Sequence, residues 1–245
     1  MTERKFDTLE REIAGDLEAG IAVDRLTARG SDTGRLLSFS DGVIAIAITL
    51  LALNIRIPNL ADRATTAEQI ASILSLQKSV LVFVQSFLVV GLYWVAHHRM
   101  FQFIRGWDLS LLWLNLLFLM SVAFLPVPNA VIVEHSGAQP AVVFFLGSAM
   151  LTGLLQLMIW LYATHRHRLI SHQVSRHVIR YISLRSLVPV GLFGLGIALS
   201  FVSVQLVWVV LLLAAVSSAG LSQFYEWVAH KTARKTTRQD LRSVR

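Results

Sequence analysis

The stretch Arg35-Leu-Leu-Ser-Phe39-Ser40-Asp41-Gly-Val-Ile-Ala-Ile46-Ala-Ile-Thr49-Leu50-Leu51-Ala-Leu53-Asn-Ile decides the fold. It opens with a short polar motif and then has no charged residue between Asp41 and Arg56. A helix that crosses a bilayer needs about twenty mostly apolar residues. The segment from Leu36 to Ile57 meets that length, so it predicts a membrane-spanning helix.

The composition of the whole chain is typical of a membrane protein. Of its 245 residues, 55% are hydrophobic and 15% are charged, whereas about a quarter of the residues in soluble domains are charged. A soluble helical bundle would have too few charged side chains to cover its surface, a need that a bilayer removes. The chain has no cysteine, which excludes disulfides, thiolate zinc sites and cysteine nucleophiles.

Five further apolar stretches have the length of a membrane span. We therefore predict an all-α integral membrane protein with six transmembrane helices per subunit. The fifth and sixth stretches join through residues 202–204. The five stretches run from Val80 to Ala96, from Leu109 to Leu125 with a stop at Pro126 and Pro128, from Ala141 to Ala163, from Leu187 to Phe201 with Pro189 near its start, and from about Leu206 to Phe224.

Lys and Arg residues gather in alternate connecting segments. They follow the second, fourth and sixth spans, whereas the segment between the third and fourth spans has neither. Short loops rich in Lys and Arg stay cytoplasmic, so both termini are expected in the cytoplasm. Because the bases flank apolar spans, the net charge of +7 indicates membrane orientation and not nucleic-acid binding.

These features divide the chain into three parts. Residues 1–34 form a cytoplasmic amino-terminal segment that holds eight of the fifteen acidic residues and no apolar run of a signal peptide. Residues 35–228 form the six-span transmembrane domain, and residues 229–245 form a basic cytoplasmic tail.

Few polar side chains lie within the predicted spans. Asp41, His97 and Asn115, together with Ser40, fall at similar depth near the cytoplasmic face if neighbouring spans run antiparallel. We expect Asp41 to be buried against His97, Asn115 or Arg35 and to hold the first span in place. A role in gating and a role in catalysis or proton relay stay open beside this structural one.

The histidines do not predict a metal site. His97 and His98 are adjacent and therefore point to different faces of a helix. The segment His165-Arg-His-Arg168 resembles a run of metal ligands, but a basic cytoplasmic loop is the simpler explanation. The sequence predicts neither a metal nor a cofactor.

The first span carries one stripe of special interest. Ile46, Thr49, Leu50 and Leu53 share a helical face by their i, i+3, i+4 and i+7 spacing. In an apolar helix such a face could contact lipid, the protein core or a pore. Spacing alone leaves these three open.

Three segments resemble the transmembrane protein 175 family. The run from Arg35 to Leu51 is similar to its signature, which is Arg, three residues, then Phe-Ser-Asp. The end of the second span is similar too, at Tyr93-Trp94-Val-Ala-His97-His98-Arg99-Met-Phe101. The third segment is Asn115-Leu-Leu-Phe-Leu with Phe124-Leu-Pro126-Val-Pro128. The resemblance covers about residues 35–130, and Asn129 departs from it where the family pattern has Thr.

The resemblance implies a potassium-selective leak channel without the usual carbonyl filter, and this chain has no Thr-Val-Gly-Tyr-Gly loop. It implies a homotetramer in the cell (inner) membrane of a prokaryote, with other copies, the bilayer and K⁺ as partners and no enzymatic activity. Span one of each subunit would line the pore, with a constriction at Ile46, Leu50 and Leu53 and a polar layer at Thr49. The motif residues Arg35, Phe39, Ser40 and Asp41 would be packed by Trp94, His97 and Asn115.

Three other functions compete with a potassium channel. A proton-conducting pore of the same fold would differ in its reversal potential under opposed potassium and pH gradients. A membrane enzyme that uses Asp41 and the histidines would need a polar cleft, and the spans offer few polar groups to build one. A secondary transporter usually has broken helices and a polar site near the midplane, and span one has no break at its centre.

Overall fold

The computed structural model describes residues 33–55, 65–135, 137–171, 173–207 and 209. Within these ranges the regular structure is helical apart from isolated β-bridge residues, of which Ile104 and Ile170 form an antiparallel pair. The helices are α3 (Gly34–Leu50), η1 (Leu51–Asn54), α4 (Thr66–Ser75), α5 (Gln77–Phe101), α6 (Leu109–Phe124), α7 (Pro126–Glu134), α8 (Gln139–Thr164), η2 (His165–His167) and α9 (Arg176–Ser200).

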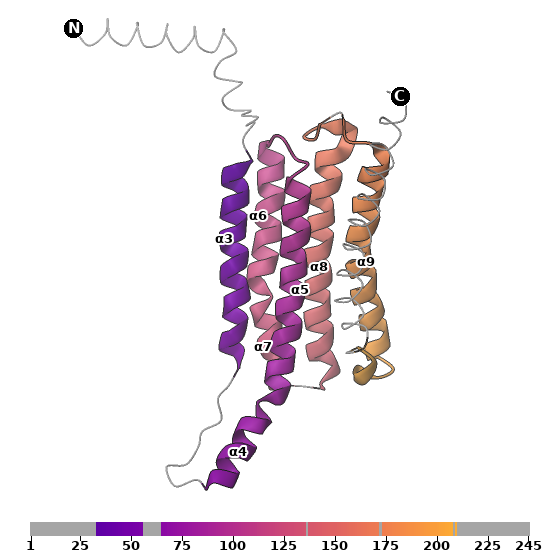
Figure 1. Ribbon diagram of the computed structural model, residues 1–245. Coiled ribbons are helices and arrows are strands. Elements are labelled where there is room, and N and C mark those ends of the chain that lie inside the picture. The colour runs from indigo at the N-terminus through magenta and orange to yellow at the C-terminus, as the bar shows by residue number, and fades with distance from the viewer. Residues whose placement is uncertain (1–32, 56–64, 136, 172, 208, 210–245) are drawn as a thin grey trace, which may run out of the picture.

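The all-helical prediction is confirmed, and five helical stretches of the described residues are long and apolar enough to cross a membrane. They lie side by side along one axis (Figure 1). Of the sixth predicted span, from about Leu206 to Phe224, the structure describes only residues 206, 207 and 209. The rest of that span lies outside the described residues, as do the predicted amino-terminal segment as far as residue 32 and the basic tail.

The predicted end of the third span is wrong. Pro126 and Pro128 do not stop the chain; they begin the short helix α7, which continues the direction of α6 as far as Glu134. Leu125 between the two helices keeps helical backbone angles. Proline is tolerated in the first turn of a helix because the amide hydrogen that it lacks has no intrahelical partner there.

The predicted start of the fifth span is also wrong. Helix α9 begins at Arg176, eleven residues before Leu187, so Pro189 lies inside the helix and not near its start. The Ser175 side chain accepts a hydrogen bond from the Val178 N–H (3.4 Å) and caps the helix. Arg176, Arg180 and Arg185 therefore lie on this helix, whereas Arg166 and Arg168 precede it.

Helix α8 is central to the packing. It contacts α5, α6, α7 and α9, and its buried side chains include Leu146, Ala149 and Trp160. Helix α3 packs against α5, α6 and α7 and lies at one edge of the bundle, on the opposite side from α9 (Figure 1). The first span is therefore covered by protein on one side only within the described part of a single chain.

Two linkers meet at the end of the bundle where α3 begins. The N–H of Arg105, between α5 and α6, donates to the carbonyl of Leu169, between α8 and α9 (2.8 Å). Asp108 caps α6 by accepting from the Leu111 N–H (2.9 Å), and its other oxygen accepts from Tyr162 Oη (2.8 Å) and Arg168 Nε (3.1 Å). Burial raises the pKa of Asp108, but these hydrogen bonds and the Arg168 charge outweigh it, so the pKa lies below its usual value.

Candidate pore face and the polar network behind it

Helix α3 has one buried face and one exposed face. Ser40, Ile44 and Ala47 are buried against the bundle, as is Leu51 in the following 3₁₀ turn. The opposite face is exposed in the single chain and carries large apolar side chains. Its members are Phe39, Ile46, Leu50 and Leu53, together with Thr49.

All four residues that the family resemblance assigns to a pore lie on this exposed face. Ile46 is 62% exposed and Leu53 is 77% exposed. The Thr49 hydroxyl donates to the carbonyl of Ile46 (2.8 Å). This bond satisfies the hydroxyl's proton within the helix and leaves its oxygen lone pairs toward the exposed side. Ile48 is half-buried and packs against the core.

A buried polar network fixes the other face of α3. The Ser40 hydroxyl donates to the Leu36 carbonyl (2.9 Å) and accepts from the Asn115 amide nitrogen (2.9 Å). The Asn115 amide oxygen lies 2.8 Å from His97 Nε2. Ser40, Asn115 and His97 are all buried. The chain of bonds thus links α3, α6 and α5.

The bond directions in this network follow from the donors available. Ser40 uses its one hydrogen on Leu36, so it must accept from Asn115, which turns the Asn115 oxygen toward His97. His97 therefore carries its proton on Nε2 and donates it to Asn115.

Aromatic rings enclose the histidine. The imidazole of His97 stacks on Phe118 (centroids 5.1 Å apart, planes within 5°) and on Phe101 (4.3 Å). Two rings on a buried imidazole exclude water and hold its orientation. His97 is therefore suited to positioning α6 against α5. No group of three metal-ligating side chains occurs in the part of the chain that the structure describes.

Of the predicted partners of Asp41, Trp94 is hydrogen-bonded to it, whereas His97 and Asn115 are not. Asp41 is half-buried and accepts a hydrogen bond from Trp94 Nε1 (2.9 Å), and none is present between it and His97 or Asn115. Neighbouring residues on a helix point about 100° apart, so Ser40 faces α6 while Asp41 turns toward the exposed Trp94 on α5. Arg35 is exposed on the first turn of α3.

Two polar contacts near the other end of α3 were not predicted. The Asn54 amide donates to the Pro126 carbonyl (2.9 Å), which ties the end of the first span to the joint between α6 and α7. The Ser86 hydroxyl donates to Asn129 Oδ1 (2.6 Å) inside the bundle. Asn129 stands out in the sequence because it departs from the family pattern at this position. The sequence does not show that its partner is Ser86 on another helix.

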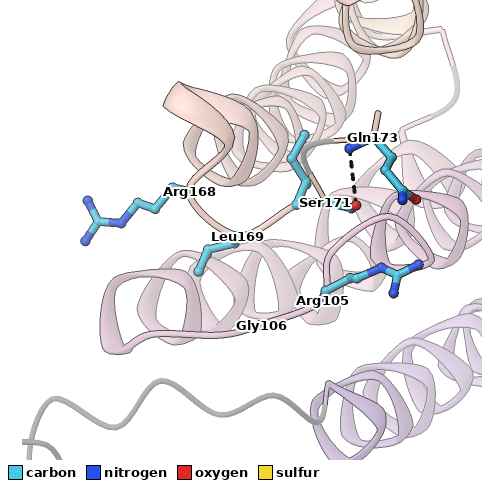
Figure 2. A pocket seen from close by; sticks show the side chains of 7 residues that line it. Arg105, Gly106, Arg168, Leu169, Ser171 and Gln173 are labelled. Atoms are coloured by element: carbon cyan, nitrogen blue, oxygen red, sulfur yellow. Dashed lines mark hydrogen bonds between the residues drawn. The ribbon is translucent and has the colours of Figure 1, made fainter. Parts of the chain in front are cut away.

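One surface pocket among the described residues is not built as an anion-binding site. Arg105, Gly106, Arg168, Leu169, Ile170, Ser171 and Gln173 line it. The two arginine side chains extend in different directions (Figure 2), so their guanidinium groups do not converge on one anion.

Known proteins resemble this chain over the region that contains α3 and the polar network. The family profile described as "Endosomal/lysosomal potassium channel TMEM175" matches residues 35–126, which include both. A potassium channel of Chamaesiphon minutus is 37% identical over 179 residues, 72% of this chain and 88% of that protein. A potassium channel of Streptomyces collinus is 34% identical over 72% of this chain and 86% of its own length.

More distant and structural comparisons point the same way. The human endosomal/lysosomal proton channel TMEM175 is 28% identical over 65% of this chain, a region that covers 31% of the human protein. The crystal structure of a lysosomal potassium-selective channel TMEM175 homolog from Chamaesiphon minutus superimposes with a TM-score of 0.69 at 35% identity. That match covers 79% of this chain and 99% of the solved one. With a relative this similar over most of both chains, the protein belongs to the TMEM175 family.

Proposed function

We propose that this chain is the subunit of a potassium channel that conducts K⁺ through a hydrophobic constriction formed by the first transmembrane helix. The relatives from Chamaesiphon minutus and Streptomyces collinus are named potassium channels. The observation that carries the proposal is the exposed stripe of Ile46, Thr49, Leu50 and Leu53 on α3. The family is one of ion channels, so the protein is not an enzyme and needs no cofactor besides its permeant ion.

The assembly is a homotetramer in which the α3 helices surround a central axis. An edge helix with large exposed apolar side chains on one face and a fixed polar network on the other is suited to such a position. The proposal places the protein in a prokaryotic cell (inner) membrane with both termini and the Lys- and Arg-rich linkers in the cytoplasm. In this proposal residues 1–34 form a cytoplasmic amino-terminal segment, residues 35–228 form the transmembrane domain and residues 229–245 form a basic cytoplasmic tail.

A ring of branched apolar side chains selects by dehydration. An ion that passes a constriction narrower than its hydrated radius must shed water and gains little from an apolar wall. Potassium sheds its shell at lower cost than sodium, so the barrier itself favours potassium. Ile46 lies near the middle of the apolar helical stretch Gly34–Asn54. Leu50 follows one turn later at the end of α3, and Leu53 follows two turns later in η1.

The buried network positions this ring. Ser40 and Asn115 fix the rotation of α3 at its cytoplasmic end, and Asn54 fixes its other end on Pro126. The network has no contact with the exposed face, so its role is to orient the helix and not to bind the ion.

A proton channel of the same fold is the second candidate. The vertebrate relatives at 28–29% identity are named endosomal/lysosomal proton channels. Opposed potassium and pH gradients across a planar bilayer separate the two functions, because the reversal potential follows the gradient of the permeant ion. A reversal potential that follows only the pH gradient would mean that the permeant ion is the proton and not potassium.

The test of the pore face is Ile46→Asn. Its amide would offer polar atoms to either ion, so we expect conductance to rise and the preference for potassium over sodium to fall in bi-ionic recordings. Ile48 is half-buried, so Ile48→Asn would perturb the core. Ala45→Asn is the better control, since Ala45 is exposed at the margin of the stripe, about 100° around the helix from Ile46.

Two results would contradict the assignment. An Ile46→Asn channel that assembles normally and keeps the parental selectivity and conductance would remove Ile46 from the constriction. A selectivity loss confined to Ala45→Asn would mean that α3 is rotated relative to the axis.

A further inference from the structure

Helices α4 and α5 form one long rod with a joint. Leu76 between them has helical backbone angles (φ −68°, ψ −16°), and the N–H of Val80 donates to its carbonyl (2.9 Å). The 36 residues from Thr66 to Phe101 would measure about 54 Å as a straight helix. The hydrocarbon core of a bilayer is about 30 Å thick.

The excess length falls on α4. With 25 residues, α5 alone is about 37 Å long, which is enough to cross the hydrocarbon. Figure 1 shows α4 beyond the end of the bundle where α3 finishes, at an angle to α5. Helix α4 therefore lies at the level where the membrane meets water.

The surface of α4 does not suit exposure to water. None of its residues is buried, and Ile73 and Leu74 are each 65% exposed, with Ile70 beside them at 54%. These three share one face by their i, i+3 and i+4 spacing, while Ser72 and Ser75 lie on the other. A helix with such faces buries its apolar side where a partner or a lipid layer is available.

The apolar face of α4 continues onto the membrane-spanning part of the rod. Helical register carries it across Leu76 in two rows of exposed side chains. One row is Ile70, Leu74, Leu81, Val84 and Leu88, and the other is Ile73, Val80 and Phe87. The part of each row on α5 lies at the depth of the hydrocarbon. The part on α4 is thus the continuation of an apolar membrane surface.

The sequence of α4 shows what stabilises the start of the helix and which force can hold it at a membrane surface. Its first turn is closed by a capping box, in which the Thr65 N–H donates to the Glu68 carboxylate (2.7 Å) and the Glu68 N–H donates to the Thr65 hydroxyl (3.4 Å). Its sequence has no Lys or Arg. The residues of α4 itself therefore offer no attraction to anionic lipid, and burial of apolar area is the force that holds the helix.

We propose that α4 is an interfacial helix that lies in the headgroup layer with Ile70, Ile73 and Leu74 turned toward the acyl chains. The ligand class is the lipid surface itself, neutral or anionic. Apolar faces of such helices sit about 5–10 Å into the boundary between headgroups and acyl chains. The assignment to the outer leaflet rests on the orientation proposed above, whereas the burial of this face does not.

The absence of natural cysteine allows a direct measurement of depth. A single environment-sensitive fluorophore is attached to Ile73→Cys or to Ser75→Cys in the full chain, reconstituted in phosphatidylcholine vesicles. Quenchers are carried on the lipid near the headgroup, on the lipid near the bilayer centre, or in water as iodide. Ser75 is the matched control, because it is exposed two residues away on the polar face.

At position 73 we expect the largest fluorescence loss with the headgroup-proximal lipid quencher and little loss with iodide. Position 75 should show the reverse, and added phosphatidylglycerol should change neither result. Equal access of iodide to both positions would overturn the proposal. So would shielding of position 73 from all three quenchers, and disulfides between copies at Ile73→Cys would then identify a second copy as the partner.

A second site and a second readout keep the test decisive. Leu74→Cys replaces Ile73→Cys if the latter does not reconstitute, with the same criteria. Potassium flux is read in the same vesicles. Flux that fails while the quenching pattern holds contradicts the proposed function and leaves the position of α4 intact.

Discussion

Replacing Asn115 with alanine tests the network that holds the pore helix. Asn115 is fully buried and makes two hydrogen bonds between helices, one to Ser40 and one from His97. Each such bond contributes about 0.5–1.5 kcal/mol net, and bonds between membrane helices average about 0.6 kcal/mol. The expected loss is therefore about 1–3 kcal/mol, near the upper end because the His97 donor is left buried without an acceptor.

Two other substitutions are expected to cost less stability than Asn115→Ala. Ser40→Ala removes the acceptor of one Asn115 bond, so we expect about 1 kcal/mol. Asp41→Ala removes one bond from the exposed Trp94 to a half-buried carboxylate, for which we expect less than about 1 kcal/mol. This order reverses the expectation from sequence, in which Asp41 was the buried member.

The assay is the apparent free energy of unfolding in mixed micelles, titrated with denaturing detergent and followed by tryptophan fluorescence. Ser121→Ala is the matched control on α6, since its hydroxyl bonds only to the Phe118 carbonyl of its own helix (2.6 Å). It should change stability little. If Asn115→Ala costs no more than Ser121→Ala, or if Asp41→Ala costs the most, the network does not hold α3.

The remaining predictions concern the two ends of the bundle. The pKa of Asp108 is lowered, so its contribution to stability is present above its unfolded pKa of about 3.9 and is lost as pH falls through the folded pKa. Asp108→Asn should lower the melting temperature at pH 7, with the gap closing in stronger acid; a gap independent of pH would contradict this. For topology, Ser75→Cys should react with an impermeant thiol reagent added to intact cells and Ser171→Cys should not, and the opposite result would invert the orientation.

The existence of the long helices could be predicted because it depends on composition alone. Apolar runs such as Ala141–Ala163 are long enough to cross a membrane, and no other structure satisfies their backbone groups in lipid. The ends of these helices could be predicted less accurately than their existence. Pro126 starts a helix as readily as it ends one, and the start of α9 depends on the cap at Ser175.

The side-chain pairing at the candidate site was the harder part. Depth in the membrane follows from counting residues along each span, and it brought Ser40, His97 and Asn115 to one level. The direction in which each side chain points depends on how the helices rotate against one another. A single sequence does not contain that rotation, so Asn115 was assigned to Asp41, whereas it is hydrogen-bonded to Ser40.

Helix α4 was missed although part of its signal is readable. Thr65 and Glu68 have the spacing of a capping box, and Ile70, Ile73 and Leu74 follow at helical intervals. The run is too short to be a span, so a search for spans alone treats it as a loop.

The position of the network behind the stripe follows from the properties of an apolar constriction. In a membrane, apolar side chains gain no hydrophobic free energy by leaving lipid for protein, so the rotation of a helix is fixed by close packing and by hydrogen bonds to its neighbours. A ring built from Ile46, Leu50 and Leu53 must therefore be oriented by contacts elsewhere on α3. The polar contacts of α3 with its neighbours fall near its two ends, at Ser40 and Asp41 and at Asn54. About 21 Å of helix lies between Ser40 and Asn54, and the apolar stripe occupies that interval.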